Sequence, residues 1–201
     1  MGGTGAEKGS KKVILASHNN GKLSELGAAL APLGWELMGM PEFDLPAPEE
    51  TGTTFEANAL LKAEAAALGS GLWALADDSG LEVDALDGAP GVLTAGYGGW
   101  ERILTELRGV PAGKRGAQFI CVLALVRAEK VPVYFKGVCR GEIALEGRGE
   151  GGFGYDPIFI PDGETRTFAQ MSKAEKSVIS HRGIAVAQLL AWVRGHMADH
   201  D

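Results

Sequence analysis

The residues from Leu75 to Gly91 (LADDSGLEVDALDGAPG) constrain this chain more than any other stretch. Apolar residues lead directly into two adjacent carboxylates, Asp77 and Asp78, and Ser79-Gly80 is expected to break the strand before a second one begins. Carboxylates crowded at the end of a buried strand repel one another and lose hydration, so they persist where a cation compensates them or where they do chemistry. A solvated acidic loop is the alternative. Because no His or Cys lies nearby, a metal held here is expected to be a hard, oxygen-seeking ion such as Mg²⁺.

Length, charge and cysteine usage restrict the class of protein. The 201 residues suffice for one large domain or for two lobes that share a core. The net charge of −7 argues against general nucleic-acid binding, and no apolar run reaches the roughly 18 residues of a membrane span. Cys121 and Cys139 lie in apolar runs and predict buried free thiols. We therefore expect a cytoplasmic protein without nucleic-acid or membrane partners, with a flexible tail over residues 1–11 and a single domain over 12–201.

Two loop-to-helix transitions have the composition of phosphate sites. An apolar run at residues 13–16 leads into SHNNGK (17–22), after which leucines recur at helical spacing. Free backbone N–H groups and the helix dipole hold a phosphate in such an arrangement, and an ordinary capped helix is the alternative. Near the C-terminus, Ser180-His181-Arg182 again gathers binding groups where a helix begins, with a plain surface position as the alternative.

A helix predicted from Phe55 to about Leu68, capped by Thr53 or Thr54, places a lysine among packed residues. At about 100° per residue, Lys62 shares a face with Phe55. A lysine so placed needs an anionic partner, which a bound phosphate would supply. A lysine that extends from the helix edge into solvent is the alternative.

The second half of the chain predicts antiparallel strands and a glycine-rich loop. Strands are expected over 119–126 and 131–138, joined as a hairpin, with a further strand over 141–145. The loop at 147–157 contains aromatic residues that can sandwich a flat base and a carboxylate that can read its edge. A hairpin turn with packed aromatics is the alternative. The sequence thus offers acidic residues that could hold a cation, loops that could bind phosphates and an aromatic loop that could bind a base. Together these segments predict a site for a nucleotide polyphosphate.

On these segments the sequence resembles the Ham1-like noncanonical purine nucleoside triphosphate pyrophosphatases. The matching segments follow the family order: ILASHNNGKLSEL, EETGTTFEANALLKA, ADDSGLEVDALDGAPGV, RGEGGFGYDPIF and EKSVISHR. The resemblance implies an α/β fold with two lobes around a long central mixed β-sheet and an active-site cleft between the lobes. It also implies a homodimer that uses Mg²⁺ to hydrolyse ITP, dITP and XTP to the monophosphate and pyrophosphate.

The resemblance further implies roles for individual residues. Asp78 is the expected proton acceptor and a metal ligand, Glu49 the second metal carboxylate and Asp77 a supporting acid. The expected substrate-binding residues are Ser17, His18, Asn19, Asn20, Gly21, Lys22, Lys62, Ser79, Phe153, Gly154, Tyr155, Asp156, Lys176, His181 and Arg182. Two positions depart from the family pattern: Gly96 stands where an arginine is frequent, and Gln170 where an acid is common. These departures concern loop detail or dimer contacts more than the chemistry.

Two other functions are consistent with the same motifs. A nucleotide sensor or carrier would use the phosphate loops without hydrolysis, but it would not need the acidic pair. A broader house-cleaning phosphatase would act on other nucleotides. Asp77 and Asp78 together with Glu49 therefore favour the pyrophosphatase, in which water activated by Asp78 attacks the α-phosphorus.

Overall fold

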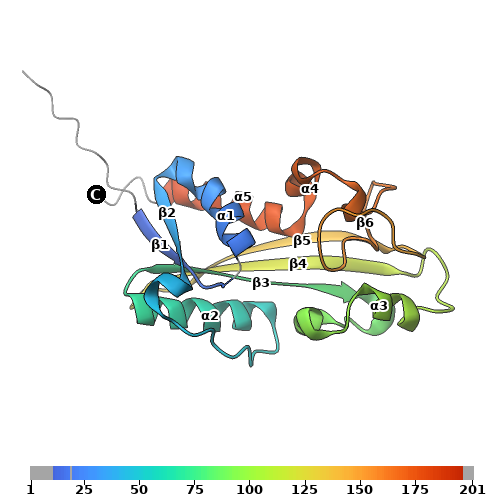
Figure 1. Ribbon diagram of the computed structural model, residues 1–201, viewed down its shortest axis with the longest axis horizontal. Coiled ribbons are helices and arrows are strands. Elements are labelled where there is room, and N and C mark those ends of the chain that lie inside the picture. The colour runs from blue at the N-terminus through green and yellow to red at the C-terminus, as the bar shows by residue number, and fades with distance from the viewer. Residues whose placement is uncertain (1–10, 19, 197–201) are drawn as a thin grey trace, which may run out of the picture.

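A computed structural model describes residues 11–18 and 20–196, and its strands form one six-stranded mixed sheet (Figure 1). The strands are β1 (Lys11–Leu15), β2 (Trp35–Gly39), β3 (Trp73–Val83), β4 (Gly116–Val126), β5 (Val133–Ile143) and β6 (Phe159–Pro161), in the order β2-β1-β3-β4-β5-β6. Strand β1 pairs parallel with β2 and β3, whereas β3 to β6 pair antiparallel. The predicted mixed sheet, with antiparallel pairing in its second half, is confirmed.

Helices cover both faces of the sheet (Figure 1). The helices are α1 (Asn20–Leu30), α2 (Phe55–Ser70), α3 (Trp100–Glu106), α4 (Lys173–Ile179) and α5 (His181–His196). Short 3-10 turns lie at η1 (Ala31–Leu33), η2 (Met40–Phe43), η3 (Asp84–Leu86), η4 (Gly91–Gly96) and η5 (Phe168–Gln170). Helices α1 and α5 bury one sheet face and α2 the other. None of these helices is both long enough and apolar enough to span a bilayer.

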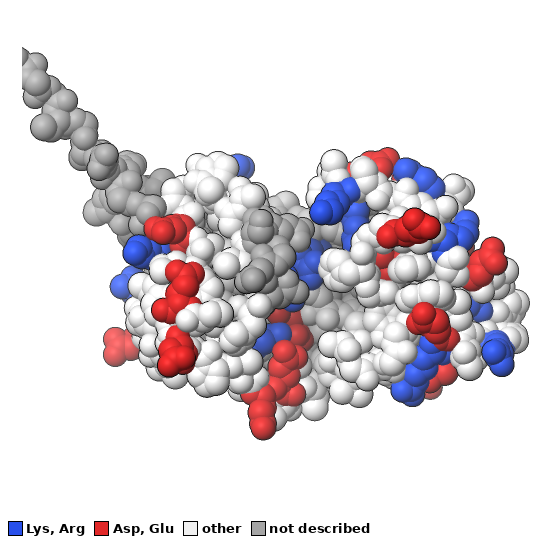
Figure 2. All heavy atoms as spheres, viewed as in Figure 1, with Lys and Arg blue, Asp and Glu red and all other residues white. Residues whose placement is uncertain are grey.

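Two lobes share the long strands β3, β4 and β5. In the first lobe, α1, α2 and α5 enclose the sheet, and in the second a separate apolar cluster joins α3, β6 and η5 to the far ends of the long strands. Figure 2 shows the surface hollowed between the lobes, with acidic and basic side chains close together there. This arrangement agrees with the predicted α/β fold.

Helix α2 follows its local sequence signals closely. The Thr54 hydroxyl accepts a hydrogen bond from the Ala57 amide at 3.1 Å, and Gly71 ends the helix in the left-handed region with a φ of 72°. Alanines at positions 59, 63 and 66 are fully buried, and their small side chains bring the helix close to the sheet. Of the two predicted caps, Thr53 and Thr54, the structure uses Thr54, and the helix extends two residues beyond Leu68.

The prediction that Ser79-Gly80 breaks the strand is wrong, because β3 continues from Trp73 to Val83. Every residue from Ala74 to Val83 is paired with β4. Gly80 is needed for close packing rather than for a turn, since a Cβ added there would lie 2.5 Å from the Gly91 carbonyl oxygen and 2.8 Å from the Phe55 ring. Asp77 and Asp78 therefore lie within a continuous strand and point to opposite faces of the sheet.

Other element boundaries also differ from the predictions. Strand β5 runs without interruption from Val133 to Ile143, so the separate strand predicted over 141–145 does not form. Strand β1 begins at Lys11, inside the predicted tail, and residues 1–10 lie outside the described residues. Helix α4 was not predicted, because it is mostly exposed and has no apolar periodicity. Its signal is the capping box of Ser172 and Glu175, in which each side chain accepts from the other's amide.

Candidate functional site

Asp77 is a buried anion to which four side chains donate. Its carboxylate forms ion pairs with Lys22 at the start of α1 and with Arg182 Nε of α5, the latter at 3.2 Å. It also accepts hydrogen bonds from Ser79 Oγ at 3.0 Å and from Cys121 Sγ at 3.3 Å. Burial raises the pKa of Asp77, but the Arg182 and Lys22 charges outweigh burial and hold the pKa far below its usual range. Asp77 is thus a permanently charged acceptor, which suits the supporting role predicted for it.

Asp78 occupies the opposite face and has a different environment. Lys62 Nζ of α2 lies 2.7 Å from Asp78 Oδ1 and 3.2 Å from Glu50 Oε1. Burial raises the pKa of Asp78, and the Lys62 ammonium opposes this rise only in part. Burial lowers the pKa of Lys62, yet contact with Asp78 and Glu50 raises it overall, so this lysine is protonated. Of the two adjacent aspartates, Asp78 has the higher proton affinity and is the better general base.

The acid that contacts Lys62 is Glu50, the neighbour of the predicted metal ligand Glu49. Glu49 is exposed on the loop that precedes α2. Asp78 and Glu50 already share one cation, the Lys62 ammonium, and their oxygen donors are of the type that Mg²⁺ prefers. Within the described ranges, no cluster of three or more His, Cys, Asp or Glu side chains could hold a metal ion. A Mg²⁺ ion would therefore take its remaining ligands from water or from phosphate oxygens.

The first predicted phosphate loop lies where β1 ends beside β3. The Ala16 amide donates to the Leu75 carbonyl at 2.8 Å, which brings Ser17 and His18 to the same edge as the acidic pair. Asn19 lies outside the described residues, and the backbones of Asn20 and Gly21 open helix α1. Lys22 follows in the first turn and reaches Asp77. The loop is therefore adjacent to the acidic strand, as a phosphate-binding role requires.

The glycine-rich loop is held by Asp156, which is buried. Its carboxylate accepts from the Phe153 amide at 2.9 Å and pairs with Lys176 of α4. Lys176 Nζ lies 4.9 Å from the centre of the Phe153 ring, which is 67% exposed. Tyr155 is instead buried and donates its hydroxyl hydrogen to the Thr94 carbonyl at 2.9 Å. Phe153 is thus the aromatic residue of the loop that is exposed for stacking, whereas Tyr155 anchors the loop.

Helix α5 begins with the two predicted residues His181 and Arg182, both of which are buried. The His181 ring stacks on Phe119 with ring centres 4.7 Å apart and planes 12° apart. Burial lowers the pKa of His181 to about 3, so the imidazole is neutral at pH 7. Its Nδ1 is buried and has no hydrogen-bond partner among the described residues. Arg182 Nη2 lies 3.3 Å from Ser79 Oγ, which connects this helix to the acidic strand.

Sequence reasoning missed two site residues on β4. Cys121 donates to Asp77, and Phe119 stacks on His181. Residues two apart on a strand share a face, so the alternation of β4 places Phe119 and Cys121 together. Their contacts follow from the register, in which Ser79 pairs with Cys121 and Leu81 with Phe119. That register joins residues about 40 positions apart, and no local pattern reveals it.

The two departures from the family pattern, at Gly96 and Gln170, lie beside the segments that hold the glycine-rich loop. Gly96 ends η4, and a Cβ added there would meet open space. Gln170 is exposed, and its Oε1 accepts from the Thr167 amide at 3.0 Å in the capping box of η5. An acid at position 170 would accept the same hydrogen bond.

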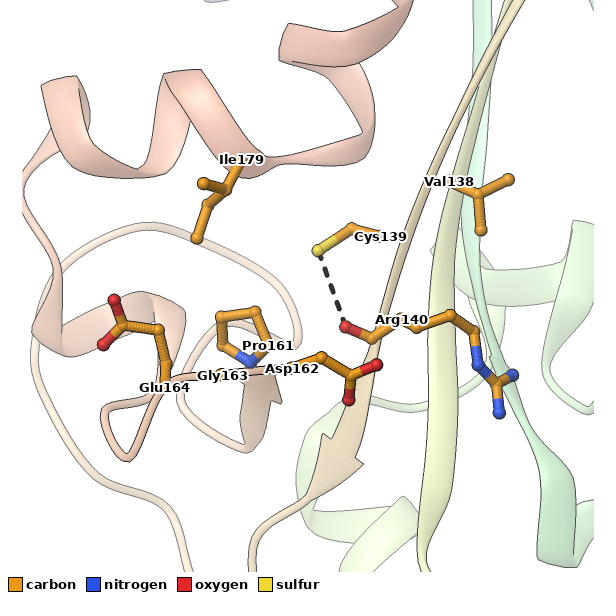
Figure 3. Close-up of a pocket in the computed structure, with 8 residues that line it drawn as sticks. All are labelled: Val138, Cys139, Arg140, Pro161, Asp162, Gly163, Glu164 and Ile179. Atoms are coloured by element: carbon orange, nitrogen blue, oxygen red, sulfur yellow. Dashed lines mark hydrogen bonds between the residues drawn. The ribbon is translucent and has the colours of Figure 1, made fainter.

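A separate pocket of about 310 Å³ lies between β5, β6 and α4 (Figure 3). Its lining residues are Val138, Cys139, Arg140, Pro161, Asp162, Gly163, Glu164 and Ile179. None of these was predicted as a site residue. Burial raises the pKa of the Cys139 thiol to about 11, so the thiol is protonated and a weak nucleophile. The ion pairs that join Lys22, Lys62 and Arg182 to the two aspartates lie outside this pocket, at β3.

Comparisons with known proteins agree with this geometry. The family model described as the Ham1 family matches residues 13–192. A dITP/XTP pyrophosphatase from Deinococcus deserti is 49% identical, over 90% of this chain and 88% of that protein. Another from Vibrio vulnificus is 43% identical, over 92% of this chain and 97% of that protein.

Solved structures show the same fold. A HAM1 protein from Coxiella burnetii has a TM-score of 0.88 at 42% identity, and the Staphylococcus aureus Ham1 protein has 0.83 at 41% identity. Each match covers 92% of this chain and 99% of the other. Because the family model spans nearly the whole described fold and the relatives match it along almost their full length, the chain belongs to the Ham1 family.

Proposed function

We propose that this chain is a nucleoside triphosphate pyrophosphatase that hydrolyses ITP, dITP and XTP to the monophosphate and pyrophosphate, and so removes them from the nucleotide pool. The observation that carries the proposal is the meeting of Lys22, Lys62 and Arg182 at the adjacent carboxylates of β3. Three cations from three helices can transfer their contacts to a polyphosphate, while an acid with raised pKa is present to activate water. The names of the curated relatives support the same activity.

In the proposed reaction the two aspartates have different tasks. Asp78 orients the attacking water and accepts its proton as the water oxygen attacks the α-phosphorus. Asp77 stays charged and holds Lys22 and Arg182 in place for the phosphates. Lys62, which contacts Asp78 and Glu50 in this structure, would move its ammonium toward a phosphate oxygen. The positive groups then neutralise charge that develops on the leaving pyrophosphate.

We also propose that the reaction depends on Mg²⁺. When bound, the ion would neutralise charge on the phosphates and the leaving group. The pair of carboxylates that shares the Lys62 ammonium, Asp78 and Glu50, fits this need because both present hard oxygen donors to one cation. Glu49 stays a predicted ligand, next to Glu50 on the same loop.

Selection of the base is assigned to the glycine-rich loop and the start of α5. Phe153 offers an exposed ring for stacking, and the Asp156–Lys176 pair offers polar groups beside it. The unpartnered Nδ1 of neutral His181 offers a further polar contact. A purine whose exocyclic groups mismatch these partners leaves buried polar atoms unpaired, which disfavours ATP and GTP.

One assay tests the proposal. Release of pyrophosphate and of orthophosphate is measured from ITP, dITP, XTP, ATP and GTP, with Mg²⁺ and with a chelator. Pyrophosphate released from the first three nucleotides, only with Mg²⁺, is the expected result. Orthophosphate, or equal rates on ATP and GTP, would indicate the broader phosphatase, whereas tight binding without any release would indicate the sensor. Asp84→Asn, on an exposed carboxylate paired with Arg140, is the matched control for Asp78→Asn.

The homodimer, the cytoplasmic location and the lack of nucleic-acid or membrane partners stay predictions. Light scattering on the purified chain measures its mass in solution and so tests whether it is a homodimer.

A further inference from the structure

Arg115 is a buried arginine whose partners are main-chain carbonyls. It is 4% exposed and directly precedes β4. Its Nε donates to the Ile143 carbonyl at 2.9 Å and its Nη2 to the Ala144 carbonyl at 3.0 Å. Its Nη1 donates to the carbonyls of Leu107 at 3.0 Å and Val110 at 3.2 Å. One guanidinium therefore joins two segments, the chain just after α3 and the end of β5.

The end of β5 is the stem of the glycine-rich loop. The Ala144 amide donates to the Ile158 carbonyl at 2.8 Å, and the Arg148 amide donates to the Pro157 carbonyl at 2.9 Å. These bonds close the loop, residues 147–157, at its base. Because Arg115 holds the carbonyl of Ala144 itself, it fixes the stem against the segment that follows α3.

We propose that Arg115 is a positioning residue for nucleobase recognition, acting through the loop stem on Phe153 and Asp156. The proposal rests on the proposed function, which assigns base contacts to this loop. The Tyr155 hydroxyl donates to the Thr94 carbonyl and so anchors the loop to η4. The stem and Tyr155 are thus each bound to another segment of the second lobe. Phe153 lies in the sequence between Arg148 of the stem and Tyr155, so both attachments limit where its exposed ring can lie.

The geometry needs an arginine rather than any cation. A guanidinium directs planar N–H donors to several carbonyls at once, whereas a lysine ammonium donates from a single atom. Arg115→Lys keeps the charge but cannot serve carbonyls on both segments, so buried acceptors are left unpaired.

The test compares Arg115→Lys with Arg108→Lys, a matched change at a neighbouring exposed arginine. Hydrogen exchange followed by mass spectrometry is measured without nucleotide. We expect the amides of Ala144 and Arg148 to exchange at least about tenfold faster in R115K, because loss of buried acceptor contacts weakens the stem. Amides of α2 should exchange as in the unchanged chain. If R115K does not fold, R115Q is the second variant; its amide also donates from a single nitrogen, so it should give the same faster exchange.

Kinetics give the second readout. R115K should raise the KM for ITP about tenfold and lower the preference for ITP over GTP, with a much smaller change in kcat. A variant that only melts at a lower temperature, with unchanged loop exchange and unchanged KM, would overturn the proposal. If the unchanged chain hydrolyses none of the nucleotides, the proposed function fails, whereas the exchange measurement still decides whether Arg115 holds the loop.

Discussion

Asp77→Asn removes the charge at the point where β3, α1 and α5 meet. The Asp77 side chain is 1% exposed, that of Arg182 11% and that of Lys22 26%. Asparagine has nearly the same shape, so packing is preserved while two cations lose their anion. Ser79, Cys121 and Arg182 donate to Oδ2 and Lys22 to Oδ1, so the amide nitrogen of asparagine faces at least one donor in either orientation.

The magnitude follows from the burial of the pair. Removing one partner of a buried ion pair costs about 3–5 kcal/mol, because the remaining charge stays desolvated. Lys22 is a quarter exposed and can turn toward water, so the lower end, about 3 kcal/mol, is expected. For a chain of this size each kcal/mol lowers Tm by about 2–4 °C, which predicts a decrease of about 6–12 °C.

Urea unfolding at pH 7, with thermal unfolding as a second measurement, checks this value. Asp84→Asn is the control, because the Asp84–Arg140 pair is about half exposed and is expected to contribute about 0–1 kcal/mol. Inorganic triphosphate should stabilise D77N more than the unchanged chain, since phosphate replaces the missing anion. If D77N unfolds within about 1 kcal/mol of the unchanged chain, Asp77 does not hold the two cations as described.

Three further predictions concern the chemistry and its pH dependence. Asp78→Asn should lower kcat by about 10²–10⁴-fold in the pyrophosphate assay, and near-normal turnover would exclude Asp78 as the base. Lys62→Met should shift the acidic limb of the kcat/KM profile to higher pH, because the ammonium opposes the burial that raises the Asp78 pKa; an unmoved limb contradicts this. His181 has a pKa of about 3 when folded and about 6.5 when unfolded, so below pH 6.5 the unfolded chain binds the extra proton and stability falls toward pH 3. His181→Phe should flatten the decrease in unfolding free energy between pH 7 and 5, measured by urea titration, and an equal decrease in both proteins would refute the assignment.

Much of the fold could be predicted because its signals are local. The cap at Thr54, the end of α2 at Gly71 and the apolar runs of β1 and β4 each depend on residues within a few positions. The same is true of the phosphate loop and the glycine-rich loop, whose composition indicated nucleotide binding before any contact was known. Helix α4 escaped prediction because an exposed helix has no apolar period, although its capping box was visible.

By itself, the sequence determined the main helices and strands and the change to antiparallel pairing in the second half, since these follow from local composition and periodicity. The roles expected of individual site residues came from the resemblance to the Ham1 family. Only the tertiary structure decided the partners: Cys121 and Arg182 at Asp77, and Lys62 with Glu50 at Asp78. It also showed that Gly80 allows close packing instead of breaking the strand. Because β3 continues through that glycine, two acids adjacent in sequence point to opposite faces. Arg182 and Lys22 outweigh burial and lower the pKa of Asp77, whereas burial outweighs the Lys62 ammonium and raises the pKa of Asp78.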